Sequence, residues 1–131
     1  MQTQSRQMPS VLLPTIMIGM TGVVPLLIVT QLFLAGLAIF ADGNLWELHG
    51  AVGGFTALPI TGSLLMSILA RSQRRLRGFS ILTFSLYALQ LLWLTIGETT
   101  GIDALRAAHA ANAGLLLLSS AALAHRSIRT M

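Results

Sequence analysis

Four long apolar runs separated by short polar segments make up most of the chain. The first run, from Val11 to Ala41, contains no charged residue, and the others cover about 45–70, 79–97 and 102–124. A helix needs about 20 predominantly apolar residues to cross a bilayer. The pattern therefore predicts an all-α protein, a single domain of four transmembrane helices at about 11–41, 45–70, 79–97 and 102–124.

Proline and glycine modify the first two helices. The first half of the first run contains four potential interruptions: Pro14, Gly19, Gly22 and Pro25. We therefore expect this run to begin as a kinked or interfacial segment and to span mainly from about 18 to 40. The run is longer than the roughly 7–15 apolar residues of a secretory signal peptide, so we expect it to be retained. Pro59 predicts a kink in the second helix.

Short polar segments connect the runs. Asp42-Gly43-Asn44 predicts a turn in which Asp42 or Asn44 caps the second helix, and Trp46 is expected at the membrane interface as an aromatic anchor. Residues 71–77 form an arginine-rich connection, and Glu98-Thr99-Thr100-Gly101 predicts the last turn. Because these connections are short, sequential helices should be antiparallel neighbours in one bundle.

The charged residues divide between the two ends of the expected helices. Seven of the eight arginines belong to one side: Arg6, Arg71, Arg74, Arg75, Arg77, Arg126 and Arg129. All four acidic residues belong to the other side: Asp42, Glu47, Glu98 and Asp103. The positive-inside rule predicts that the arginine side and both termini are cytoplasmic, in a multi-pass protein of the bacterial inner (cytoplasmic) membrane.

Composition narrows the possible functions. Hydrophobic residues make up 54% of the 131 residues and charged residues only 9%, whereas a soluble domain carries about 25% charged residues. The net charge of +4 does not indicate nucleic-acid binding, because the arginines cluster at helix ends. The sequence has no cysteine, which excludes disulfides, thiolate metal sites, iron–sulfur clusters and covalently attached c-type haem.

Two histidines fall at similar depths in the second and fourth helices. His49 lies roughly 5 Å, and His109 roughly 10 Å, below the start of its helix at 1.5 Å per residue. Helices two and four are diagonal in an up-down bundle, so both imidazoles can face its centre. Ionisable groups inside a membrane are by default functional, because burying them unpaired is costly. We therefore expect His49 and His109 to ligate the iron of one b-type haem near the outer face.

Small residues beside each histidine suit a porphyrin. Gly53 lies one turn below His49 on the same helical face. Asn112 and Ala113 lie one turn below His109 in the same way. A flat ring packed against a helix needs short side chains next to its ligand, so these three residues are the expected neighbours of the cofactor.

Arg106 is the one arginine on the acidic side of the charge pattern. It lies three residues before His109 and one turn nearer the outer surface. A guanidinium in this position can pair with a propionate carboxylate of the haem. Glu47 and Asp103 can also pair with Arg106 without any ligand.

A structural role is the alternative for both histidines. Each can hydrogen-bond a polar neighbour and fasten helices together, the candidates being Gln31, Gln90 and Asn112. The glycines then indicate close helix packing, since Gly50 and Gly54 form a GxxxG motif.

The remaining polar residues indicate no second site. His125 lies roughly 24 Å further along the helix than His109 and is expected at the cytoplasmic interface. Zinc or non-haem iron fits the sequence poorly, because either would need three or four ligands with carboxylates close by. Gln31, Tyr87 and Gln90 can bond one another, line a quinone or lipid pocket, or fasten the bundle.

Two motifs carry a resemblance to known proteins: Leu48-His49-x-x-x-Gly53 and Leu105-x-x-x-His109-x-x-Asn112. With the four-span topology, the sequence resembles membrane b-type cytochromes built as four-helix bundles, in particular half of haem A synthase, and small four-span bacterial proteins of unassigned function. The resemblance implies haem held by histidines of the second and fourth helices. The synthase pattern has a glutamate three residues before its histidine, whereas here Glu47 stands two before His49, which argues against haem-modifying catalysis.

The leading hypothesis is therefore an electron carrier or haem-handling protein with one bis-histidine haem. A single haem does not carry electrons across the whole bilayer, so a quinone, a homodimer or a larger membrane redox complex would be its partner. Two alternatives are an accessory subunit that packs on a larger complex, and a small transporter or quinone-site protein. An electron carrier or subunit is expected in preference to a self-contained enzyme.

Overall fold

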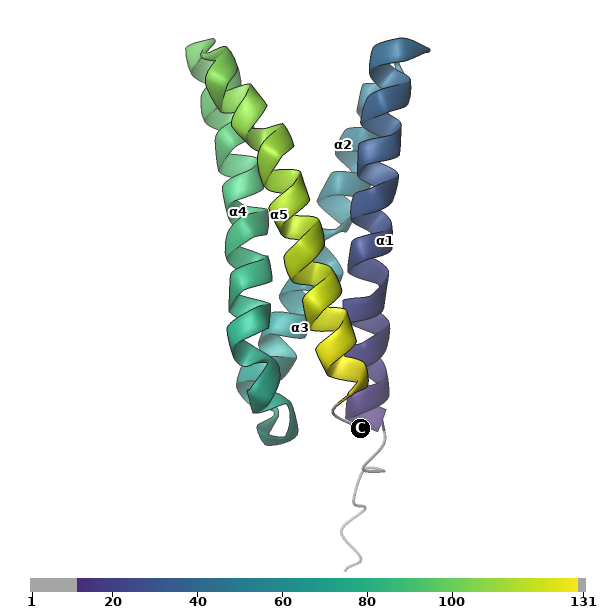
Figure 1. The fold of residues 1–131 in the computed structure, drawn as a ribbon, viewed down its shortest axis with the longest axis vertical. Coiled ribbons are helices and arrows are strands. Elements are labelled where there is room, and N and C mark those ends of the chain that lie inside the picture. Colours follow the sequence, from purple (N-terminus) through teal and green to yellow (C-terminus); the bar gives the residue numbers. More distant parts are fainter. Residues whose placement is uncertain (1–11, 130–131) are drawn as a thin grey trace, which may run out of the picture.

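The computed structural model describes residues 12–129, and these residues form helices with no strand among them (Figure 1). The elements in chain order are α1 (Leu12–Phe40), α2 (Leu45–Phe55), α3 (Ala57–Leu69), the 3-10 helix η1 (Arg71–Leu76), α4 (Arg77–Thr100) and α5 (Asp103–Ile128). Because α2 and α3 together make one span, the prediction of an all-α fold with four long helices is confirmed.

The first helix is continuous from Leu12 to Phe40, so neither Pro14 nor Pro25 divides it. α1 has Pro25 in its interior, and Pro14 lies in its first turn, where the backbone N–H has no intrahelical acceptor in any case. Pro25 removes one backbone hydrogen bond, while Val24 and Ile28 beside it are buried in the core. Tertiary packing therefore holds the helix together there. Val11 and Arg6 lie outside the described residues.

The break between α2 and α3 confirms the kink expected at Pro59. The helix is interrupted at Thr56, because Pro59 has no N–H for the carbonyl of Phe55 and its ring crowds that carbonyl. The Tyr87 hydroxyl of α4 donates a hydrogen bond of 3.0 Å to the carbonyl of Gly53, just before the break. A side chain of a neighbouring helix thus supplies a hydrogen bond to a backbone carbonyl at the kink, as an apolar environment requires.

Two helix ends lie beyond the expected boundaries of 79–97 and 102–124. α4 continues through Glu98-Thr99-Thr100, where the Thr100 hydroxyl donates to the Ile96 carbonyl at 2.6 Å. It ends at Gly101, whose φ of 70° is the left-handed conformation that glycine adopts most readily. α5 continues to Ile128, which places basic residues in its last turn. Positive charge there interacts favourably with the helix dipole.

The first turn also differs from expectation in its capping. Asn44 makes no side-chain hydrogen bond at the start of α2. Instead, Asp42 Oδ1 accepts the backbone N–H of Asn44 at 3.0 Å. The carboxylate therefore closes the turn itself and does not cap the helix.

The helices form two antiparallel hairpins that diverge toward one end (Figure 1). One hairpin joins α1 to α2, and the other joins α4 to α5. α3 packs against α1 and α4, and α5 packs against α4 and α1. The span formed by α2 and α3 is therefore diagonal to α5, as the sequence predicts. The start of α1 and the end of α5 lie at the same end of the molecule (Figure 1).

Arginines gather where the hairpins converge. η1 carries Arg71, Arg74 and Arg75 and packs against α3, α4 and α5. The Arg126 guanidinium lies 4.1 Å above the ring of Phe79, which joins the end of α5 to the start of α4. The basic and acidic ends predicted from the sequence are thus opposite ends of one structure.

The outside of the protein is more apolar than much of its interior. Seven large apolar side chains are more than 60% exposed: Leu26, Phe33, Ile39, Phe40, Leu58, Leu69 and Leu118. Inside, small hydroxyl residues join the helices, with the Thr21 and Ser127 hydroxyls 2.7 Å apart and those of Thr83 and Ser119 3.2 Å apart. Four helices are long and apolar enough to cross a membrane, so the fold is that of a multi-pass membrane protein.

Buried apolar residues of α1, α3, η1, α4 and α5 form the two core clusters. One apolar cluster joins Met17, Leu76 and Leu123, and a second contains Val24, Ile28, Ile60, Tyr87 and Leu116. α2 contributes no buried residue to either cluster. The diverging end of the bundle, where α2 lies, is consequently the open part of the interior.

Candidate functional site

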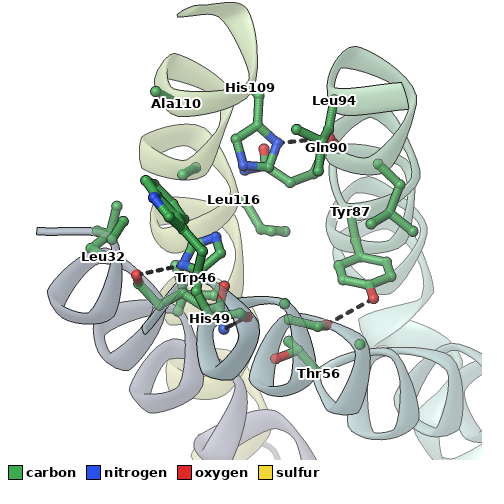
Figure 2. Close-up of a pocket in the computed structure, with 18 of the residues that line it drawn as sticks. Leu32, Trp46, His49, Thr56, Tyr87, Gln90, Leu94, His109, Ala110 and Leu116 are labelled. Carbon is green, nitrogen blue, oxygen red and sulfur yellow. Dashed lines mark hydrogen bonds between the residues drawn. The ribbon is translucent and has the colours of Figure 1, made fainter. Parts of the chain in front are cut away.

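A cavity of about 610 Å³ lies between the two hairpins at their diverging end. Protein sites for cofactors and small molecules measure about 300–1,000 Å³. Helices α1, α2, α4 and α5 line it. The two diagonal spans contribute one face each: Trp46, His49, Gly50, Gly53 and Gly54 from α2, and Arg106, His109, Ala110 and Ala113 from α5. Spacings of three and four residues place each set on one side of its helix. Both histidines therefore line one cavity (Figure 2).

His49 is held against α1 by two reciprocal hydrogen bonds. Its Nδ1 lies 3.0 Å from the backbone oxygen of Gln31, and the Gln31 side-chain amide donates to the backbone oxygen of His49 at 2.6 Å. Trp46 packs edge-on against the imidazole, with 5.3 Å between ring centroids and 81° between planes. The ring is thus fixed on both sides while the residue stays half-buried.

His109 is held against α4 in a parallel way. Its Nδ1 lies 2.9 Å from the backbone oxygen of Gln90. The Gln90 side-chain Nε2 lies 3.3 Å from His109 Nε2 (Figure 2). Asn112 Nδ2, one turn further along α5, donates to Gln90 Oε1 at 2.6 Å and to the Leu86 carbonyl at 2.8 Å.

These bonds assign the same tautomer to both histidines. A carbonyl oxygen only accepts, so Nδ1 must carry the proton in His49 and in His109. In the neutral ring Nε2 is then unprotonated, so its lone pair can accept a hydrogen bond or bind a metal. Metal-ligating histidines are commonly oriented by such an Nδ1–H bond to a backbone carbonyl, which also makes the other nitrogen more basic.

The glycines of α2 leave open space next to His49. Apart from its own helix backbone, a Cβ atom added at Gly50 or Gly54 would have no atom of residues 12–129 within 4 Å. At Gly53 it would lie 3.2 Å from Oε1 of Gln31, so this glycine lets the Gln31 side chain pass. Gly50 and Gly54 therefore border the cavity and do not form a helix-packing motif, whereas Gly53 has a packing role.

Arg106 lies at the mouth of the cavity and is paired within the protein. Its Nε is 3.0 Å from Glu98 Oε1, and its Nη1 is 3.1 Å from Asp103 Oδ1. Asp103 is one of the two partners expected from the sequence, while Glu98 takes the place of Glu47. The Arg106 side chain is 44% exposed, and ion pairs this exposed contribute only about 0–1 kcal/mol. A carboxylate ligand can therefore compete for the guanidinium at little cost.

Most of the site residues expected from the sequence converge on this cavity. His49, His109, Gly53, Arg106 and Ala113 line it. Asn112 is buried behind them, between α5 and α4, and acts on Gln90. His125 lies in the last turn of α5, near the converging end.

Sequence reasoning missed two features of the site. Trp46 lines the cavity in addition to lying near the helix start, and its spacing of three residues from His49 is the signal for this. The backbone oxygens of Gln31 and Gln90 orient the rings, and no side-chain pattern reveals them. The separations are nevertheless similar, 18 residues from Gln31 to His49 and 19 from Gln90 to His109. The two hairpins therefore build the same contact twice.

Within residues 12–129, no group of three or more His, Cys, Asp or Glu side chains is placed to hold a metal ion. A metal at this cavity would have to bring further ligands of its own. An iron porphyrin would do so with its ring nitrogens.

Comparison with known proteins places the chain in a family. Residues 31–96, which are 66 of the 131 residues, match a family of unknown function, DUF6220. The chain belongs to DUF6220. The matched part includes His49, Tyr87 and Gln90 and ends before His109. Neither the curated proteins nor the solved structures contain a match.

Proposed function

We propose that this protein is an inner-membrane haem-binding protein that holds one b-type haem between His49 and His109. The observation that carries the proposal is that both imidazoles line one cavity with Nδ1 bonded to a backbone carbonyl. This leaves Nε2 of each ring, the atom a haem iron would bind, without a proton.

The other lining residues fit the same cofactor. Gly50 and Gly54 leave space beside His49, and Ala110 and Ala113 do so beside His109. Arg106 at the mouth is the group that would pair with a propionate. The acidic end of the bundle, where this mouth lies, faces the outside when the arginine end is cytoplasmic.

When bound, a haem with two histidine ligands supplies one-electron redox chemistry and has no open position for oxygen. We therefore favour electron transfer or haem handling over oxygen activation. The chain's own residues would orient the ligands, exclude water and balance the propionate charge. Because the cavity lies at one end of the spans, electron transfer would also need a partner: a quinone, a second copy of the chain or a larger membrane redox complex.

The test is a reduced-minus-oxidised spectrum of the purified full chain, with ferric protoporphyrin IX supplied. The expected result is a low-spin b-type spectrum that is lost in His49→Ala and in His109→Ala. His125→Ala is the matched control, because His125 lies far from the cavity on the same helix as His109; it should keep the spectrum. A colourless wild type, or a spectrum indifferent to both cavity substitutions, would refute the proposal.

A quinone site is the second candidate, because Gln31, Tyr87 and Gln90 also line the cavity. The Tyr87 hydroxyl already donates to Gly53, and both glutamine amides bond the histidine segments. A quinone carbonyl would have to displace one of these donors, whereas an iron needs only the two imidazole nitrogens. Stabilisation of the protein against thermal unfolding by a quinone analogue, with no porphyrin spectrum, would favour this candidate. A colourless protein that co-purifies with a complex would favour an accessory subunit.

A further inference from the structure

The two histidines differ in what surrounds the nitrogen facing the cavity. In the first hairpin, the Gln31 amide donates to the backbone oxygen of His49, away from Nε2. In the second, the Gln90 amide donates to Nε2 of His109 itself. The atom that would ligate iron is thus covered in one hairpin by a side chain that has no counterpart in the other.

Asn112 makes this cover movable. Its Nδ2 donates to Gln90 Oε1 and to the Leu86 carbonyl, and these two acceptors together fix the orientation of the Asn112 amide. Its Oδ1 is then buried and has no hydrogen-bond partner among the described residues, 12–129. A buried acceptor of this kind is costly to leave unpaired.

Asn112 Oδ1 is therefore an unpaired acceptor close to Gln90 Nε2, a donor whose present hydrogen bond is long. Gln90 Nε2 reaches His109 Nε2 at 3.3 Å, beyond the usual range of about 2.7–3.2 Å for such bonds. The bond from Asn112 Nδ2 to Gln90 Oε1 is short, at 2.6 Å. A rotation of the Gln90 amide about that short bond would bring its Nε2 to Asn112 Oδ1 and complete a two-bond pair between the amides.

We propose that the Gln90 amide is a two-position cap that controls ligation by His109. In one position it donates to His109 Nε2, and in the other it donates to Asn112 Oδ1 and leaves the imidazole lone pair free. This inference rests on the proposed function and deepens it. His49 is the standing ligand, and His109 becomes a ligand only when Gln90 pairs with Asn112.

The exchange needs no proton transfer. His109 keeps its proton on Nδ1, bonded to the Gln90 backbone oxygen, in both positions. One hydrogen bond to Nε2 breaks and one to Asn112 Oδ1 forms, which would leave the lone pair of Nε2 available to a metal. Gln90 is accordingly a positioning residue, and its arrangement suits a protein that takes up and releases its cofactor at one ligand.

Ferric protoporphyrin IX titrated into the haem-free full chain tests the cap. Gln90→Leu cannot donate to His109, so it should bind about two- to tenfold more tightly than wild type in the bis-histidine form, the effect of one hydrogen bond removed. Gln31→Leu is the matched control from the other hairpin and should show no such gain. Gln90→Met, which is unbranched and flexible, repeats the test should leucine disturb folding. Unchanged or weaker binding in both Gln90 variants would overturn the inference.

Nitrogen NMR of the histidine side chains in the haem-free protein gives an independent readout. We expect both rings to be protonated at Nδ1, and the Nε2 resonance of His109, not that of His49, to move in Gln90→Leu. A proton on Nε2 of His109, or an unmoved resonance, would overturn the cap. This arm separates the two proposals: a wild type that binds no iron porphyrin refutes the proposed function, while the nitrogen shift still decides whether Gln90 covers His109.

Discussion

Filling the cavity from α2 should weaken cofactor binding without unfolding the protein. Gly50 lines the cavity, and a Cβ atom there would meet nothing within 4 Å. Gly50→Leu should therefore be tolerated by the fold and, since glycine is the poorest non-proline helix former, raise helix stability by roughly 0.5–1 kcal/mol. The leucine side chain would nevertheless occupy space next to His49 that a flat ring requires.

The size of the binding defect follows from overpacking. Forcing extra methyl groups into an occupied site costs about 1–3 kcal/mol, which corresponds to a roughly 5- to 150-fold loss of affinity. The assay is titration with ferric protoporphyrin IX, alongside thermal unfolding of the same samples in detergent. Gly114→Leu is the matched control, because Gly114 on α5 also has open space around it but does not line the cavity. Equal affinity in Gly50→Leu and wild type would show that the ring does not occupy this cavity.

Three further experiments test the fold around the site. In Gly97→Ala the new Cβ would lie 3.1 Å from the backbone of α5, so unfolding in detergent should become easier by about 1–3 kcal/mol, whereas Gly36→Ala, with open space, should not weaken the protein. Pro59→Ala should merge α2 and α3 into one straighter helix, seen as a changed α2–α5 distance between paired spin labels; an unchanged distance would contradict a proline-determined kink. Single cysteines at Ser72 and Gly43 should be labelled from opposite sides of the membrane, Ser72 from the cytoplasm, and labelling of both from one side would contradict the four-span topology.

The outline of the fold is readable from sequence because it depends on local and additive properties. Apolar length gives the four spans, and Pro59 breaks the second of them because a missing N–H acts wherever the residue stands. Pro25 shows the limit of this reasoning. The same residue type leaves α1 continuous, since Val24 and Ile28 are buried against other helices, and that burial is decided by the whole bundle.

The candidate site divides in the same way. Matching depths of His49 and His109 can be counted along two helices, and the structure brings both to one cavity. The hydrogen-bond partners of the two imidazoles cannot be predicted from spacing. Which backbone carbonyl lies beside each ring, that of Gln31 or of Gln90, depends on how the two helices of each hairpin are aligned. Whether Arg106 meets Glu47 or Glu98 is likewise a question of which hairpin it belongs to, and the structure pairs it with Glu98.

Chain connectivity has a consequence for how a rigid molecule could reach the interior. The 41–44 turn joins α1 to α2, and residues 101–102 join α4 to α5, so each links two helices of the same hairpin (Figure 1). Within residues 12–129, the covalent tie from one hairpin to the other is the segment at 70–76, at the opposite end. In the described part of the chain, no backbone segment therefore crosses the mouth of the cavity. A flat, rigid ligand could therefore enter and leave edge first when the two hairpins separate. Neither a loop nor a helix would have to unfold for this.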